Sequence, residues 1–228
     1  MAPSDRPLGI PDLPSGPLGE LFAAGRLQRL RPGAIVLSEG DVSNRVVLVL
    51  GGRLKVSTFS ADGRETVLGF RTRGDVLGEL AAIDGEPHSA NVTVTAPTDL
   101  VVLQSDRFIA ELRARPEVML ALLRSVIVRL RDADRKRGEF ATLTTDGRIA
   151  ERLIELAAEA GGDAAAARIR GDAPSFPITQ AELAGWVGCS REAANKALGR
   201  FADLGLVELG RGRVTILDLG GLRRSVAV

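Results

Sequence analysis

Hydrophobic and polar positions follow two different periods along the chain. Between residues 31 and 106, short apolar runs such as AIVL, RVVLVLGGRLKVSTF and ANVTVTA alternate with turns rich in Gly and Asp. Many short strands with frequent turns are typical of an antiparallel sandwich or barrel. The dipeptides Asp62-Gly63 and Gly51-Gly52 lie between such runs and are typical of hairpin turns. We therefore expect this part of the chain to form a β-barrel.

A helical period replaces the strand period after residue 115. Strong helix formers over residues 116–139 predict one long helix, whose apolar positions recur at alternating spacings of four and three, as in a coiled-coil seam. The seam positions are Met119, Leu123, Val126, Leu130, Ala133, Arg137 and Phe140. Leu120, Leu122 and Ile127 form a second apolar face. We expect one face to pack on the barrel and the other on a second copy of the chain, giving a two-fold homodimer; a helix packed only on its own barrel is the alternative.

The end of this helix carries a run of basic residues: Arg131, Arg135, Lys136 and Arg137. Such a run usually forms a solvated face, which we expect here rather than direct contact with DNA. Gly138 precedes a predicted hinge at about residues 140–147. An amphipathic helix over residues 148–160 and a Gly/Ala-rich segment over residues 161–167 follow the hinge.

Residues 180–201, QAELAGWVGCSREAANKALGRF, predict two short helices joined by a turn at Gly188. Thr179 and Glu182 have the spacing of a capping box before the first helix, and Ser190 is placed to cap the second. The inward face of the second helix carries Ala194, Ala197, Leu198 and Phe201. This pattern predicts a helix-turn-helix, which typically binds duplex DNA. A helical hairpin with a solvated charged face is the alternative.

The outward face of the second helix carries side chains that can read base edges. Arg and Lys donate to guanine, Glu accepts from cytosine, and Asn pairs with adenine. The outward residues are Arg191, Glu192, Asn195, Lys196 and Arg200. The candidate DNA contacts on the helix pair are the first four of these together with the two capping residues, Ser190 and Thr179.

A predicted hairpin follows the helix pair. Residues 206–217, LVELGRGRVTIL, contain two β-rich runs around Gly210-Arg211-Gly212-Arg213. A helix-turn-helix followed by such a hairpin is a winged helix. Arg211 and Arg213 at the tip are therefore candidate contacts to the phosphate backbone.

Composition narrows the function classes. The chain has 228 residues, which is enough for two modest domains. Its 30 basic residues nearly balance its 29 acidic ones, so DNA binding has to come from a local patch of positive charge.

The single cysteine excludes an intrachain disulfide and a four-cysteine metal site, and a lone histidine predicts no metal site. No sequence motif places a nucleophile near a base, so we expect the protein to have no catalytic activity. With no signal peptide and no membrane-spanning stretch, we expect a cytoplasmic protein without membrane contact.

The string GDVLGELAAIDGEPHSANVTV at residues 74–94 is similar to the phosphate-binding cassette of cyclic-nucleotide-binding domains. Followed by the long helix and the winged helix, it makes residues 21–222 resemble the cAMP receptor protein and FNR family of bacterial transcription regulators. CSRE at residues 189–192 is a close match to the family's recognition helix. The resemblance implies base contacts from Arg191, Glu192 and Lys196, although Lys196 stands where the best-known members carry arginine. It also implies a roughly palindromic double-stranded site and RNA polymerase as a partner.

The same resemblance places a ligand site in the cassette. A short helix beginning near Gly78 would present backbone N–H groups to an anion, and Glu79 would accept from a ribose hydroxyl. The family's arginine and serine or threonine pair, which grips the cyclic phosphate, falls on His88 and Ser89, and its adenine-facing positions fall on Ala133 and Asp134. The candidate ligand residues are Gly78, Glu79, Leu80, His88, Ser89 and Asp134.

Neutral imidazole at position 88 lacks the permanent charge of a guanidinium. We expect no required cofactor, with cAMP or another cyclic nucleotide as a candidate effector and an altered ligand or no ligand as alternatives. A purely structural role for the cassette glycines is a further alternative.

The expected fold class is α+β, in four parts. They are an irregular arm at residues 1–20, a cyclic-nucleotide-binding-like jelly-roll barrel at residues 21–115, a dimerisation helix and hinge at residues 116–140, and a winged helix-turn-helix at residues 141–228. A short helix is expected at residues 18–27. The expected function is that of a dimeric, sequence-specific DNA-binding transcription regulator whose barrel senses a ligand. A cyclic-nucleotide-sensing subunit acting on a protein partner and an effector-independent regulator with a degenerate ligand site are the alternatives.

Overall fold

The computed structural model describes residues 13–159 and 173–226. The chain divides into two compact units, Met1–Arg131 and Asp132–Val228, each of which has its own core. The predicted arm lies largely, and the Gly/Ala-rich segment wholly, outside the described residues. None of the described helices combines the length and the apolar character needed to cross a membrane.

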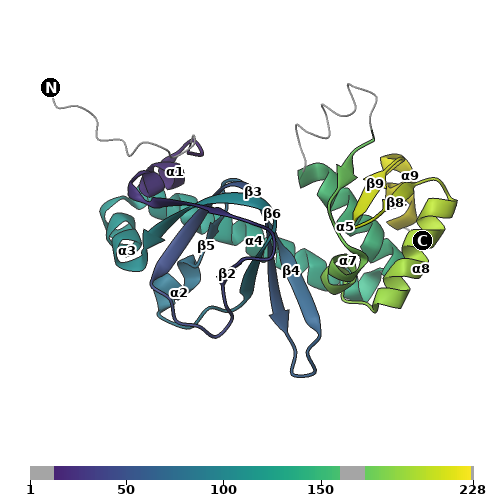
Figure 1. Cartoon of the computed structure of the whole chain (residues 1–228), viewed down its shortest axis with the longest axis horizontal. Helices are drawn as coiled ribbons and strands as arrows, with labels where there is room; N and C mark the ends of the chain where they lie inside the picture. Colours follow the sequence, from purple (N-terminus) through teal and green to yellow (C-terminus); the bar gives the residue numbers. More distant parts are fainter. Residues whose placement is uncertain (1–12, 160–172, 227–228) are drawn as a thin grey trace. The chain divides into compact units, whose positions relative to one another are not determined.

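The first unit is built on a six-stranded antiparallel sheet (Figure 1). Its main path runs β1-β6-β3-β4, while β2 pairs with β6 and β5 pairs with β3. The strands are β1 (Arg26–Leu30), β2 (Ile35–Leu37), β3 (Arg45–Phe59), β4 (Glu65–Arg71), β5 (Val76–Leu77) and β6 (Asn91–Gln104). The predicted α+β fold class is confirmed, but β1 and β4 form the two ends of the path, so the sheet is not a closed barrel.

One of the two predicted hairpin turns is confirmed and the other is wrong. Asp62-Gly63 lies in the turn between β3 and β4, where Gly63 has φ 78°. Gly51-Gly52 instead lies inside β3, which continues through it and shifts register against β6 at this point. A Cβ at Gly52 would lie 2.3 Å from the carbonyl oxygen of Pro97, so the glycine permits a close approach of two strands at a bulge.

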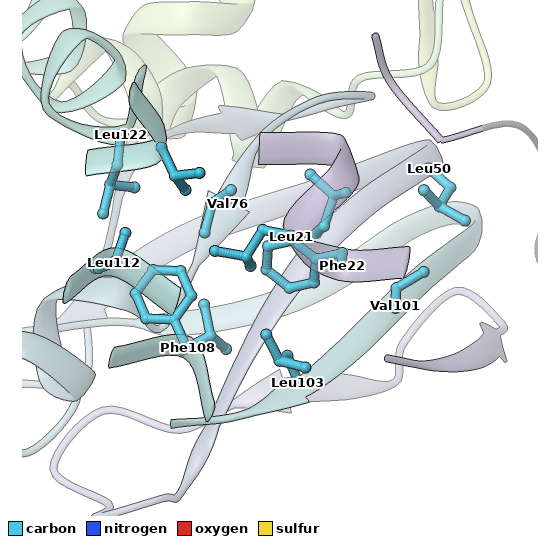
Figure 2. Close-up of a cluster of buried hydrophobic side chains, with 12 residues drawn as sticks. Leu21, Phe22, Leu50, Val76, Val101, Leu103, Phe108, Leu112 and Leu122 are labelled. Atoms are coloured by element: carbon cyan, nitrogen blue, oxygen red, sulfur yellow. The ribbon is translucent and has the colours of Figure 1, made fainter. Parts of the chain in front are cut away.

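Helices close one side of this sheet around an apolar core (Figure 2). They are α1 (Pro17–Leu21), the 3-10 turn Phe22–Ala24, α3 (Ser105–Ala114) and the first turns of α4 (Pro116–Thr142), while the short α2 (Glu79–Asp84) follows β5. Figure 2 shows Phe22 and Phe108 facing each other in this core, with ring centroids 6.4 Å apart. The helix expected at residues 18–27 ends early, because β1 begins at Arg26.

The long helix α4 presents two different faces. Val118 and Leu122 are buried in the core of the first unit. The expectation that Leu120 and Ile127 also pack there is wrong, since both are exposed. The buried stripe follows positions four apart, which leaves Leu120 on the opposite side of the helix. The exposed large apolar side chains of α4 are Met119, Leu120, Leu123, Ile127, Val128, Leu130 and Phe140.

The second unit contains the predicted helix-turn-helix and hairpin. Its helices are the end of α4, α5 (Thr145–Glu159), α7 (Gln180–Val187), α8 (Arg191–Asp203) and α9 (Leu219–Val226). The strands β8 (Val207–Gly210) and β9 (Arg213–Ile216) form the hairpin, and β7 (Ser175–Phe176) pairs with β9 on its other side. The patterns predicted neither β7 nor α9. At the expected hinge, α4 continues to Thr142 and α5 already begins at Thr145.

Candidate DNA-binding face and ligand cavity

Both helices of the helix-turn-helix begin at the predicted caps. The Thr179 hydroxyl accepts from the Glu182 N–H at 3.1 Å, and the Glu182 carboxylate accepts from the Thr179 N–H at 2.9 Å. The Ser190 hydroxyl accepts from the Ala193 N–H at 3.1 Å. Gly188 ends α7 in the left-handed conformation, with φ 70°. The capping box and the turn glycine are therefore confirmed, and together they fix the direction of α8 after α7.

The two faces of α8 differ sharply in burial. The inward residues predicted from the helical period are buried, as expected: Ala194, Ala197, Leu198 and Phe201. The candidate base-reading residues are all exposed: Arg191, Glu192, Asn195 and Lys196. Such a helix can offer its polar face to a groove while the apolar face holds it to its own domain.

Arg200, the fifth outward residue of α8, has a partner within its own unit. Its Nε donates to the Asp146 carboxylate at 2.8 Å, and its Nη2 also contacts that carboxylate. The hydrogen bond to Asp146 raises the pKa of Arg200, so its guanidinium stays positively charged. The contact joins the end of α8 to the start of α5, which favours a structural role for Arg200.

The hairpin after α8 carries two exposed arginines. Gly210 pairs with Arg213 at the end of the ladder, and Gly212 has φ 68° in the turn. Arg211 and Arg213 are both exposed at this tip. Exposed guanidinium groups on a hairpin are suited to phosphate contacts, which contribute affinity without sequence information.

The first unit contains a cavity of about 430 Å³ beside α2 and α4. Five of the six predicted ligand residues line it: Gly78, Glu79, Leu80, His88 and Ser89. The sixth, Asp134, lies on α4 beyond the last cavity residue of that helix, Leu130, and its carboxylate pairs with Arg137 at 3.3 Å. Arg71 and Arg129 also line the cavity, and the sequence reasoning missed both.

Glu79 and Arg129 form an ion pair in this cavity. Glu79 is only 2 % exposed, and its Oε1 accepts from Nη2 of Arg129 at 2.5 Å. The pair neutralises the carboxylate, which a buried acid requires. Arg129 follows Val118, Leu122 and Ser125 on the stripe of α4 that faces the first unit, so the helical period was the signal that could have identified it.

Gly78 holds the cassette close to β3. It has φ 80°, and a Cβ there would lie 2.7 Å from the Arg45 carbonyl oxygen. Both the left-handed conformation and the close approach favour glycine. The architectural role of this glycine, one of the alternatives from the sequence, therefore has direct geometric support.

His88 is buried and faces a hydroxyl group. The residue is 6 % exposed, and its Nε2 lies 2.5 Å from the Ser43 Oγ. The backbone of His88 is also fixed, since its N–H donates to the Asp41 carbonyl and its carbonyl accepts from the Gly40 N–H. Burial, together with the charge of Arg45, lowers the pKa of His88 below its ordinary value of 6.5. The ring is therefore neutral near pH 7 and supplies no cation for a phosphate.

Comparison with known protein families covers both units. Residues 27–115 match the family described as cyclic nucleotide-binding domain, and residues 147–225 match the Crp-like helix-turn-helix domain. The second match agrees with the helix-turn-helix described above. The alternative of a regulatory subunit that acts only on a protein partner therefore has no support.

Individual relatives extend the similarity over most of the chain. The CRP-like cAMP-activated global transcriptional regulator of Mycobacterium tuberculosis is 32 % identical over 193 residues, which are 84 % of this chain and 84 % of that protein. FixK2 from Bradyrhizobium japonicum has a TM-score of 0.75 at 16 % identity, covering 90 % of this chain and 98 % of that one. The c-di-GMP responsive global regulator CLP of Xanthomonas campestris has a TM-score of 0.72 at 22 % identity, covering 86 % and 96 %. The two structures show a shared fold, while the mycobacterial sequence shows common descent over both units. The chain therefore belongs to the cAMP receptor protein and FNR family of DNA-binding transcription regulators.

Proposed function

We propose that this regulator binds DNA as a homodimer and reads a roughly palindromic duplex through the exposed face of α8. The observation that carries the proposal is the division of α8 into one buried apolar face and one exposed polar face. In the proposal, the polar side chains enter the major groove and contact base edges: Arg191, Glu192, Asn195 and Lys196. Bidentate contacts of this kind discriminate one base from another.

The phosphate backbone is assigned to a second set of residues. Arg211 and Arg213 of the hairpin would neutralise phosphates on one side of α8. Thr179 and Ser190 lie exposed at the starts of the two helices of the motif, where short polar side chains contact phosphates. These contacts would fix the position of α8 in the groove without reading sequence.

The exposed apolar face of α4 supports the dimer. Met119, Leu123 and Leu130 belong to the predicted seam and are exposed in the single chain. Large apolar side chains that line one face of a helix stabilise a dimer when a second helix covers them and removes them from water. A two-fold dimer through α4 would present two recognition helices to two half-sites, about one helical turn of DNA apart.

The proposal keeps the functional division of the chain made from the sequence: sensor at residues 21–115, dimerisation helix at residues 116–140 and DNA-binding part at residues 141–228. In its support, α3 ends at Ala114 and α4 begins at Pro116. RNA polymerase as a partner, a cytoplasmic location and the lack of enzymatic activity belong to the same proposal and rest on the family.

The DNA-binding assignment is tested by selecting duplexes from a random pool and then measuring variants on the selected and on a scrambled duplex. Arg191→Ala should cost about 1–3 kcal/mol on the selected duplex and little on the scrambled one. Arg211→Ala should weaken both and reduce the salt slope by about 1. Arg107→Ala, an exposed arginine of α3, is the control. Equal losses on both duplexes for Arg191→Ala would contradict base reading.

We propose the cavity of the first unit as the effector site, with a cyclic nucleotide as the first candidate and no required cofactor. Glu79 and Ser89 support such a ligand, whereas the neutral His88 predicts that a cyclic phosphate binds weakly. Calorimetric titration with cAMP, cGMP and a cyclic dinucleotide tests this, and His88→Arg should bind cAMP more tightly than the unaltered protein. Tight binding of cAMP by the unaltered protein would show that a neutral ring suffices, and no heat with any of the three would favour an effector-independent regulator.

A further inference from the structure

Six charged side chains and one tryptophan form a junction cluster in the second unit. The last turns of α4 contribute four of the charges, α5 contributes two, and α7 contributes the ring. The members are Asp132, Arg135, Lys136, Glu139, Arg152, Glu155 and Trp186. The cluster therefore connects the end of α4 to the first helix of the helix-turn-helix.

Arg152 is at the centre of the junction cluster. Its side chain is 2 % exposed, with Nη2 at 2.5 Å from Glu139 Oε2 on α4 and Nη1 at 3.2 Å from Glu155 Oε2 on α5. One guanidinium thus holds carboxylates from two helices, as its planar fork permits and a point-like ammonium does not. Lys136 extends the network, since its Nζ lies 3.0 Å from Glu155 Oε1.

Trp186 continues the network into α7. The Lys136 ammonium lies 5.2 Å from the centroid of its ring, and the Arg152 guanidinium lies 5.6 Å from it. Cations at such distances are attracted to the face of an indole ring. The attraction is stronger when the ring is buried, and Trp186 is buried. A second contact lies one turn further along α4, where the ring of Phe140 lies against Gly188.

The charges of the junction cluster balance, with three acids and three bases. Arg135 and Lys136 pair with Asp132 at 2.5 and 2.6 Å. Burial would raise the pKa of Asp132, but its bonds to Lys136 and Arg135 outweigh that effect and lower it. The expectation of a solvated face at the basic end of α4 is wrong for Lys136, whose side chain is only 15 % exposed, whereas the Arg135 side chain remains 45 % exposed. Both charges nevertheless pair with carboxylates of the same unit.

We propose that Arg152 is a positioning residue, which fixes the direction of the helix-turn-helix against the last turns of α4. The inference rests on the proposed dimer, in which α4 carries the two-fold seam. If the helix-turn-helix is held rigidly to the end of α4, the separation of the two recognition helices is fixed as well. The junction cluster then determines which spacing of half-sites the dimer accepts, while α8 determines which bases it reads.

The test measures binding of the full-length protein to the selected palindrome, to versions with one or two base pairs inserted or removed between the half-sites, and to a single half-site. Each base pair changes the separation by about 3.4 Å. Arg152→Met should lower the affinity for the original spacing about tenfold, a change typical of losing coupled contacts. Its affinity for the single half-site should change by less than about twofold, the scatter expected of a site without direct contact. The preference for one spacing should become broader.

Matched variants separate positioning from folding. Arg224→Met makes the same change at an exposed arginine of α9 and should leave the spacing preference unaltered. Arg152→Met combined with Glu139→Gln removes one acid together with one base and so restores the charge balance of the junction cluster; it should recover stability and still accept the broader range of spacings. Arg152→Lys keeps the charge but not the fork and should behave like Arg152→Met. Trp186 is the only tryptophan, so its emission reports on the cluster directly and should change in all three Arg152 variants but not in Arg224→Met.

Two results would overturn the proposal. One is an equal loss on the palindrome and on the single half-site, which would mean that Arg152 only stabilises the domain. The other is an unchanged spacing preference in a folded Arg152 variant. If the unaltered protein itself shows no preference for a palindrome over a half-site, the proposed dimer fails instead, and the emission of Trp186 still tests whether Arg152 organises the junction.

Discussion

Gly188 provides the sharpest test of the turn in the helix-turn-helix. It has φ +70°, a left-handed conformation that costs a residue with a Cβ about 1–2 kcal/mol. A Cβ there would also lie 2.7 Å from Cζ of Phe140. Because Phe140 is 54 % exposed, its ring can move away, and the steric contribution should be the smaller of the two. Gly188→Ala should therefore destabilise the second unit by about 1–2 kcal/mol, which for a unit of this size lowers Tm by roughly 4–16 °C.

Gly199→Ala is the matched control. Gly199 lies inside α8, and a Cβ there would meet no heavy atom within 4 Å. Alanine in a helix interior should therefore stabilise by about 0.5–1 kcal/mol relative to glycine. Thermal unfolding followed by the emission of Trp186 measures both variants in the same unit. Shifts of the same sign for the two substitutions would refute the reasoning. Adding Phe140→Ala to Gly188→Ala isolates the steric part, because the backbone cost remains when the ring is gone.

Three further predictions concern the cassette, the recognition helix and the core. Burial lowers the pKa of His88, so the unfolded chain binds its proton more readily; the free energy of unfolding should fall as pH decreases through about 6.5 toward the folded pKa, and His88→Gln should flatten a urea-denaturation series across that window. Ser190→Ala removes the cap of α8 and should cost about 1 kcal/mol of unfolding free energy, whereas Ser190→Asp should retain most of it. Phe108→Ala in the buried core should cost about 3–5 kcal/mol by denaturant unfolding, and the half-exposed Phe59→Ala should cost far less.

The features predicted correctly from the sequence depend on neighbouring residues. The capping box, the turn glycine and the inward face of α8 lie within about two dozen consecutive positions, where backbone geometry alone decides which side chains share a face. The wing followed from two short β-rich runs around Arg211 and Gly212. Period and turn chemistry therefore predicted the caps of the helix-turn-helix, the buried and exposed faces of α8 and the hairpin after it.

The features that were missed depend on contacts between distant segments. Gly51-Gly52 has the composition of a hairpin turn, but β6 lies alongside it and holds it inside a long strand. Glu79 and Arg129 are 50 positions apart, and nothing in the local sequence pairs them. The contacts of Trp186 with Lys136 and Arg152 likewise join residues far apart in the chain, and nothing in the local sequence around Trp186 indicates them. Each of these contacts is set by the tertiary packing, which overrides a local preference.

The effect of a substitution at position 88 depends on the charged groups around it. By the family resemblance, His88 stands at the position of a phosphate-binding arginine, and the charge of Arg45 acts on its ring. Arg45 itself donates to the Val36 carbonyl at 2.6 Å, so it is held in place by the sheet. A guanidinium introduced at position 88 would be buried near a second one, which costs free energy in the empty protein and becomes favourable once an anion binds between or beside them. The gain from His88→Arg should therefore appear as ligand-linked stabilisation, while the variant without ligand is less stable than the unaltered protein.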